Sequence, residues 1–294
     1  MRTISVMTIA LLTVVLSISK TTFAQDTKPE VYDKIHIPKK KPIPYPYTRE
    51  ADVMWSKIVW RMLDLREKMN LPLYYPATPI AERMNLIHLI FNGIDNEGLV
   101  AYDVQDAFNE FKLPISKADL EANMGNVAKK EQIVDTTGQT VEKDVAGERK
   151  YDEVKKFLVK EKWFFDKSYS TMQVRIIGLC PIRLYKRDLK VAGNAAGAED
   201  DNANLEMKQV CWIYYPEARP LFARSPIFNT HNDAQQISFD DLFMQRRFTS
   251  YIYKESNVYQ NRRIEEYSTG FEILLEGERI KQTIADFEHD LWEY

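Results

Sequence analysis

Histidines are the side chains in this sequence best suited to bind a metal ion or to move a proton near neutral pH. None has a second His or a Cys at the spacing of known zinc sites. His231 lies two residues before Asp233, and His289 lies between Glu288 and Asp290, so each could form one half of a metal or acid–base site. The alternative for both is an ordinary surface or hydrogen-bonded histidine. The four histidines are His36, His88, His231 and His289.

The two cysteines, Cys180 and Cys211, are candidates for a disulfide or for a nucleophile. Each lies in an apolar run typical of a β-strand, away from any histidine or helix start, which argues against a reactive thiol. If the two runs pair as a hairpin with its turn near residues 194–197, the cysteines lie opposite each other and a disulfide is possible. Cys180 also shares a strand face with apolar residues, so a buried unbridged thiol is the equal alternative.

Other motifs that would indicate a reaction are missing from the sequence. There is no Gly-x-Ser-x-Gly nucleophile motif, and the ten glycines are scattered without a phosphate-binding pattern. Residues 95–98, Asp-Asn-Glu-Gly, are similar to the start of a calcium loop, but the glycine is misplaced and the far glutamate is missing. We therefore interpret this segment as a turn and predict no catalytic, cofactor or metal site.

The first 24 residues predict export. Arg2 precedes an apolar run from Ile4 to Ile18, and Thr22-Phe23-Ala24 fits a signal peptidase site, so residues 1–24 are predicted to be a cleaved signal peptide. Removing Arg2 and Lys20 from the 40 basic residues leaves 38 against 43 acidic ones, a net charge of about −5 for the 270-residue mature chain. This charge argues against nucleic acid as a partner, and no later run is apolar enough to span a membrane.

Residues 25–48 predict an extended arm. Prolines recur there and remove backbone hydrogen-bond donors, which favours a polyproline-like path. The arm is either a solvated tether or a strap over a neighbouring subunit, and Tyr45 and Tyr47 are candidate partner contacts because aromatic residues are unusual in a plain linker. The prolines are Pro29, Pro38, Pro42, Pro44 and Pro46.

The first element of the folded domain is predicted to be a helix over 51–69, since apolar residues recur there at spacings of three and four. Val59, Trp60 and Leu63 form a second apolar patch on this expected helix. Two apolar surfaces need two partners, so the helix is either buried deep in its own domain or presents Trp60 to another protein.

The rest of the N-terminal half is expected to be helical, followed by a polar insertion. Thr78-Pro79 predicts the start of a helix over 80–91 that Asn92-Gly93 ends, and 103–111 predicts a short amphipathic helix. Residues 123–149 lack large apolar side chains and predict a mobile insertion or a polar hairpin.

The second half predicts a sheet and then helices. Runs with β-branched and aromatic residues predict strands over 157–165, 173–185 and 207–215, with an edge or a bulge at Pro181. Ser238 predicts the cap of a helix over 239–253, and 278–292 predicts a C-terminal helix. The expected fold is α+β, with N-terminal helices, a central antiparallel sheet and C-terminal helices. A single domain, 49–294, would comprise a helical part at 49–122, the insertion at 123–149, the sheet at 150–216 and a second helical part at 217–294.

Several segments of the sequence form a recognisable pattern. They are Trp55-Ser-Lys57, Trp60-Arg61, Asp64 to Lys68, Asn70, Pro72 to Pro76, Phe239 to Asn257, Arg279-Ile280 and Glu288 to Trp292. Together these segments resemble the GldN/PorN family of the type IX secretion and gliding machinery. The similarity covers most of the mature chain, apart from the insertion and the loop at 188–204.

The resemblance implies a non-enzymatic periplasmic protein that forms a ring with an outer-membrane lipoprotein of the PorK/GldK type. It also implies contact with the periplasmic part of a PorM/GldM-type motor protein, and self-neighbours in the ring. The competing hypothesis is a periplasmic enzyme or ligand-binding domain that uses His231 or His289 with nearby carboxylates. A ring subunit needs large heterologous contacts, whereas the enzyme should be a monomer with a concave pocket.

Overall fold

The computed structural model describes residues 36–80, 83–104, 110–126, 129–134, 140–145, 147–186, 205–229, 232 and 234–291. The predicted signal peptide, the arm up to residue 35, the loop at 188–204 and the centre of the predicted 103–111 helix lie outside these ranges. Among the helices within them, none has the length and apolar character needed to cross a bilayer. The fold class is α+β, as predicted.

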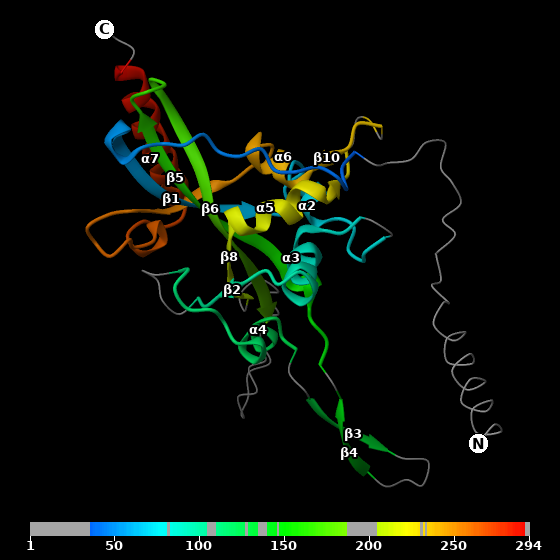
Figure 1. Ribbon diagram of the computed structural model, residues 1–294. Coiled ribbons are helices and arrows are strands. Elements are labelled where there is room, and N and C mark those ends of the chain that lie inside the picture. The colour runs from blue at the N-terminus through cyan, green and yellow to red at the C-terminus, as the bar shows by residue number, and fades with distance from the viewer. Residues whose placement is uncertain are drawn as a thin grey trace, which may run out of the picture. The chain divides into compact units, whose positions relative to one another are not determined.

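A seven-stranded antiparallel sheet organises the chain (Figure 1). Three long strands form the centre of the sheet, and a short turn joins the second of them to the third. The first and last strands of the chain pair at one edge of the sheet. The strand order is β11 (Tyr251–Glu255), β1 (Val53–Asp64), β5 (Val154–Asp166), β6 (Thr171–Lys186), β8 (Trp212–Tyr214) and β2 (Ala101–Tyr102), and β7 (Leu205–Gln209) also pairs with β6.

The predicted helix over 51–69 is wrong, because β1 occupies most of it. Val59 and Leu63 point to one face of the sheet and Trp60 and Met62 to the other, and all four are buried. A strand covered on both faces loses its alternation of apolar and polar residues, and its dense apolar positions then also fit helical spacing. Trp60 is therefore a core residue of a strand and not part of a helix surface.

The predicted strands of the central region are confirmed, with one division. The run at 207–215 is split into β7 and β8, and its last residue, Tyr215, begins a helix. Leu179 pairs with Ile213 and Ile182 pairs with Gln209, so two residues of β6 face three residues of the next strand. Pro181 lies at this bulge, as its missing N–H led us to expect.

Three helices cover the face to which Val59 and Leu63 point, here called the helix face. They are α3 (Leu86–Asn96), α5 (Tyr215–Arg224) and α6 (Phe239–Met244), and their apolar side chains share one cluster with Leu63, Phe157 and Val159. The helix predicted over 80–91 begins later than expected, because Asn85 and not Thr78 caps it. Gly93 lies inside this helix, where a Cβ atom would come within 2.5 Å of Leu221 Cδ2.

The C-terminal helices were located correctly but their ends were not. Ser238 and Asp241 form the capping box of α6, yet the helix ends at Met244 because Arg246 adopts a left-handed conformation with φ of 54°. The last three residues of the predicted segment, from Tyr251 to Tyr253, belong to β11. The last helix, α7 (Glu272–Asp290), starts six residues before the predicted Glu278 and packs on the helix face through Ile280 and Ile284, next to Val59.

The remaining elements are short. Residues 129–134 and 140–145 pair as an antiparallel hairpin, which agrees with the polar-hairpin alternative for the insertion. The short elements are η1 (Glu50–Asp52), α2 (Leu71–Tyr74), α4 (Lys117–Asn123), β3 (Lys129–Val134), β4 (Thr140–Val145), η2 (Tyr151–Glu153), β9 (Pro226–Ile227), β10 (Ile237–Ser238) and η3 (Ile264–Glu266).

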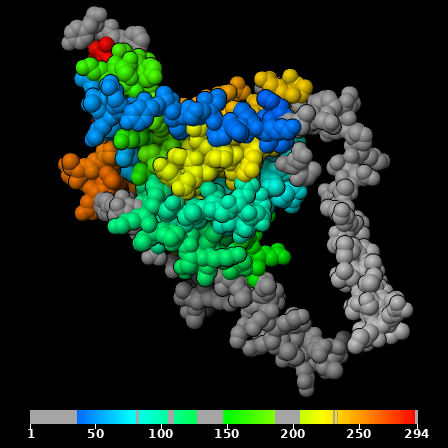
Figure 2. Space-filling view, in the orientation of Figure 1, coloured from blue at the N-terminus to red at the C-terminus, as the bar shows by residue number. Residues whose placement is uncertain are grey.

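The described part of the arm packs on its own domain. Ile37 is fully buried, and Arg219 donates from Nη2 to the Ile43 carbonyl at 2.7 Å while Arg175 donates to the Pro46 carbonyl at 2.6 Å. Figure 2 shows this blue segment lying against the yellow segment that contains α5. From residue 36 onward the arm is therefore not a free tether, because arginines of its own domain bind its carbonyls.

Candidate functional site

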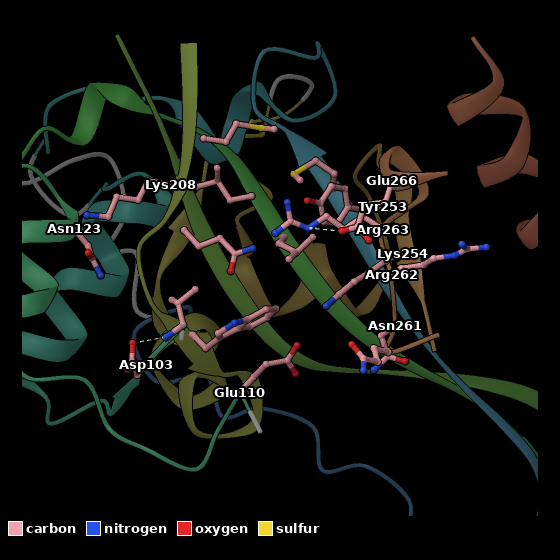
Figure 3. Close-up of a pocket in the computed structure, with 18 of the residues that line it drawn as sticks. Asp103, Glu110, Asn123, Lys208, Tyr253, Lys254, Asn261, Arg262, Arg263 and Glu266 are labelled. Carbon is pink, nitrogen blue, oxygen red and sulfur yellow. Dashed lines mark hydrogen bonds and ion pairs between the residues drawn. The ribbon is translucent and has the colours of Figure 1, made fainter. Parts of the chain in front are cut away.

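The other face of the sheet, to which Trp60 and Met62 point, contains a hollow of about 1020 Å³ (Figure 3). We call this the hollow face. Strands β1, β5, β6 and β8 supply the apolar floor, while α4, β7 and the segment that follows β11 form the walls. The floor side chains are Met62, Leu158, Ile182 and Trp212.

One row of paired residues crosses the hollow face and sets its charge. The strand register places Lys254 beside Trp60, Trp60 beside Lys160, and Lys160 beside Gly178. Gly178 has no side chain, and Phe111 occupies the space, since a Cβ atom there would lie 2.4 Å from Phe111 Cζ. The row therefore holds two lysines separated by a tryptophan ring, with a phenylalanine closing one end.

Glu110 neutralises one of the two lysines. It accepts a hydrogen bond from Trp60 Nε1 at 2.9 Å and forms an ion pair with Lys160, and its side chain is buried. Both carboxylate oxygens thus have a partner, as a buried charge requires.

Lys254 is not neutralised in this way. Its Nζ atom lies 4.2 Å from the centre of the Trp60 ring, and it forms no ion pair with any residue of the described ranges. Burial lowers the pKa of its ammonium group, and the nearby Lys160 lowers it further, although Glu110 opposes this. A desolvated cation facing a hollow favours an anionic group from outside the subunit.

The wall after β11 adds two arginines. Arg262 lies between the rings of Tyr259 and Tyr267, with its guanidinium carbon 4.6 and 4.5 Å from their centres. Arg263 lies over the Tyr253 ring and 3.8 Å from a carboxylate oxygen of Glu266. Stacking fixes the direction of these planar groups at modest cost in conformational freedom.

The carboxylates that line the hollow already have partners within the chain. Glu266 pairs with Arg263, Glu110 with Lys160, and Asp119 accepts from Ser116 at the start of α4. Of the lining cations, Lys208, Lys254 and Arg262 have no carboxylate partner among the described residues. The described lining of the hollow thus holds four carboxylates and four cations around a buried apolar floor, and three of these cations lack a carboxylate partner within the described residues.

This lining suits binding better than bond chemistry. The described lining residues include no His, Cys, Ser or Thr. Across the described ranges no group of three metal-ligating side chains occurs. Aromatic rings, methionine and arginine around an apolar floor are typical of protein interfaces.

The residues predicted to contact partners fall into two groups. Tyr47 is 87 % exposed, and Tyr45 is half-buried between Arg175 and Arg219. By contrast, Val59, Trp60 and Leu63 are at most 2 % exposed and belong to the core, so the structure gives them no surface with which to contact a partner. The error follows from the helix assignment, which placed the three side chains on one surface.

Both cysteines are buried free thiols that belong to different apolar clusters. Burial raises the pKa of Cys211 to about 12 and raises that of Cys180 as well. The thiols are therefore poor nucleophiles, and the structure corresponds to the unbridged alternative.

The histidines do not form a site within the described ranges. His289 is exposed on α7, and the His88 ring stacks on Tyr151 with centres 4.0 Å apart while burial lowers its pKa. His231 and Asp233 lie outside the described residues.

Sequence reasoning missed the hollow and its charged residues. Lys160 directly follows the apolar run Phe157-Leu158-Val159 in a predicted strand and was the available signal, because a charge inside a buried strand must be paired or face a cavity. Lys254 within Tyr-Ile-Tyr-Lys was hidden by the helix predicted over 239–253.

Two comparisons with known proteins bear on the chain. A family model described as "Gliding motility associated protein GldN" matches residues 48–293. No curated protein matches the sequence.

Proposed function

The chain belongs to the GldN family of gliding-motility-associated proteins, and from that premise we propose that it is a non-enzymatic structural subunit of the type IX secretion and gliding machinery. In this proposal it forms a periplasmic ring with an outer-membrane lipoprotein of the PorK/GldK type. Contact with a PorM/GldM-type motor protein would couple the ring to energy from the inner membrane.

The observation that carries the proposal, beside the family match, is the hollow. Three of its lining cations, Lys208, Lys254 and Arg262, have no carboxylate partner among the described residues, as expected of a surface that another protein covers. The predicted signal peptide supports a periplasmic location at the inner face of the outer membrane, reached through the lipoprotein partner.

The competing enzyme or ligand-binding hypothesis depends on His231 or His289. His289 lies on the exposed side of α7, away from the lining of the hollow. None of the described residues that line the hollow is a histidine, so we keep the structural role as the proposal.

Co-expression with a PorK/GldK-type lipoprotein, made without its lipid, tests the proposal directly. The mature chain should co-purify with the lipoprotein and elute from a size-exclusion column as a large assembly. An unrelated periplasmic protein of similar charge serves as the control partner. A chain that elutes as a monomer and does not bind the lipoprotein would contradict the proposal. A metal ion or small molecule bound to the purified chain would favour the enzyme hypothesis.

A further inference from the structure

The first half of β6 forms an open edge of the sheet. On one side β6 pairs with β5, and on the other it pairs with β8 at Gly178 and Leu179 and with β7 from Ile182 onward. No strand within the described ranges pairs with residues 171–177 on that second side, and Figure 1 shows β6 continuing with β5 past α5 toward α7. We call residues 171–177 the free edge. About half of its backbone N–H and C=O groups face away from β5, where a further strand can bind them.

The arm runs beside the free edge without pairing with it. Arg175 donates from Nη2 to the Pro46 carbonyl at 2.6 Å and to Thr48 Oγ1 at 2.9 Å, which are contacts of a side chain. Among the described residues, no backbone hydrogen bond joins the arm to the free edge. A groove of about 690 Å³, lined in part by Tyr45, Arg175 and Ile177, lies between them. The groove leaves room for side chains of a strand added to the edge.

Two cations lie directly opposite each other beside this groove. The register of β5 and β6 pairs Lys162 with Arg175, and like charges in this position are destabilising. Arg175 donates only to the neutral oxygens of the arm, and Lys162 forms no ion pair with any described residue. A second like-charged pair, Arg183 with Lys208, is relieved by Glu153, which forms an ion pair with Arg183. The pair beside the free edge has no such relief.

The occupant that fits both observations is an extended protein segment with an acidic residue. A strand presents backbone donors and acceptors at the spacing of the free edge. A carboxylate on that strand beside Arg175 would offset the charges of Arg175 and Lys162. Glu50, the one carboxylate among the described residues that line the groove, is exposed and forms an ion pair with neither cation.

We propose that the free edge binds an extended segment of another protein as an added strand, with an acidic residue of that segment beside Arg175. Side chains two positions away from the acidic residue lie on the same face of the added strand and enter the groove. This inference rests on the proposed function, because it assigns the segment to a partner of a structural subunit. It adds the place of the contact and the chemistry of the segment.

Synthetic peptides test the proposal on the wild-type mature chain without the lipoprotein. The probe is a fluorescently labelled nine-residue peptide of alternating threonine and valine with a central glutamate, and the matched peptide has lysine in that place. Binding is measured by fluorescence anisotropy up to about 1 mM protein. The glutamate peptide should bind at least about tenfold more tightly, because the lysine would face two cations.

Methylation of the peptide backbone tests whether the peptide pairs as a strand. An added strand turns alternate amides toward β6 and away from it. Two glutamate peptides are compared, each methylated on one of the two alternate sets of amide nitrogens. One of them should lose binding at least about tenfold, and the other should bind like the parent peptide.

Arg175→Gln tests the position of the acidic residue. The glutamine keeps a donor for the Pro46 carbonyl but removes the charge, so the preference for glutamate over lysine should fall to about threefold or less. Lys156→Gln is the matched control and should keep the preference, since Lys156 lies on the same strand as Lys162 but pairs with Ile182, beyond the free edge. Circular dichroism and melting check that both variants are folded.

Hydrogen exchange locates the bound peptide. With the glutamate peptide present, exchange of the backbone amides should slow in the free edge and stay unchanged in β7 and α6.

Four outcomes would overturn the inference. They are no binding of the glutamate peptide, equal binding of the two methylated peptides, slowed exchange only outside the free edge, and self-association of the wild-type chain through the free edge, which would make the occupant a second copy. None of these measurements uses the lipoprotein, so such a failure leaves the co-purification test of the proposed function unaffected. A chain that does not bind the lipoprotein refutes the proposed function by itself.

Discussion

Asp240 on the helix-covered side of the sheet and Lys254 on the hollow face differ in how their charges are compensated. On the side of α5 and α6, Arg219 donates to Asp240 from Nε and Nη2 at 3.0 and 3.1 Å, and Tyr215 donates to the same carboxylate at 2.9 Å. On the hollow face, Lys254 lies over the Trp60 ring and has no carboxylate partner among the described residues.

This difference separates residues that stabilise the subunit from residues available to another protein. A buried charge whose partners are complete adds rigidity and little capacity to bind. A desolvated cation without a carboxylate costs the isolated subunit stability and gains a partner only on association. The substitutions below should therefore change stability and association independently on the two faces.

Trp60→Ala should have the largest effect on stability, because it removes a core ring and leaves Glu110 without its indole donor. The free energy of unfolding should fall by about 3 to 5 kcal/mol, measured by urea denaturation. Trp60→Phe, which keeps a ring and removes only the N–H, should lose clearly less. Equal losses would mean that the packing of the ring contributes little.

Asp240→Asn tests the helix-covered side. It leaves the buried Arg219 guanidinium without its carboxylate and should destabilise the subunit by about 3 kcal/mol. Self-association of the folded variant should match that of the wild type, because this side lies away from the hollow. If the fully folded variant associates more weakly than the wild type, the helix-covered side also contributes to association, and the proposed difference between the two faces is wrong.

Arg149→Gln sharpens the comparison through pH. Hydrogen bonds from Arg149 lower the pKa values of Glu121 and Asp95, so both carboxylates stabilise the fold above their unfolded pKa, near 4, and lose that contribution as pH falls through the lowered values. The variant should be about 1 to 2 kcal/mol less stable at pH 7. Melts across pH 2 to 7 should converge at the acid end; a constant gap would contradict this reading.

Lys254→Met should give the smallest change in stability, and in the opposite direction. Removing a cation whose pKa is lowered by burial should raise the free energy of unfolding by up to about 1 kcal/mol at neutral pH. The gain should shrink as pH rises toward 10, where the wild-type lysine loses its charge. A loss of stability would show that Lys254 belongs to the fold and not to a binding surface.

The parts of the fold that local rules determine could be predicted from the sequence. The strands β5 and β6 have long apolar runs, and the capping box at Ser238 and Asp241 marks the start of α6 without any tertiary information. Strand β1 could not be predicted, since Val59 and Trp60 are both buried and the pattern that identifies a strand requires one exposed face.

The hollow depends on relations that one sequence does not contain. Lys254, Trp60 and Lys160 become neighbours only through the register of three strands that are far apart in the chain. The prediction that Val59, Trp60 and Leu63 form a partner surface was wrong for the same reason. The apolar start of α7 could have been recognised, because its leucines extend the helical pattern toward the N-terminus on the side away from the core.

Hydrogen exchange of the backbone amides in the isolated chain and in the assembly with its lipoprotein tests the central claim most directly. The account predicts that exchange slows on assembly in residues 256–267, which wall the hollow, while α3, α5 and α6 are unchanged. Slowing confined to those three helices, with the wall of the hollow unaffected, would contradict it.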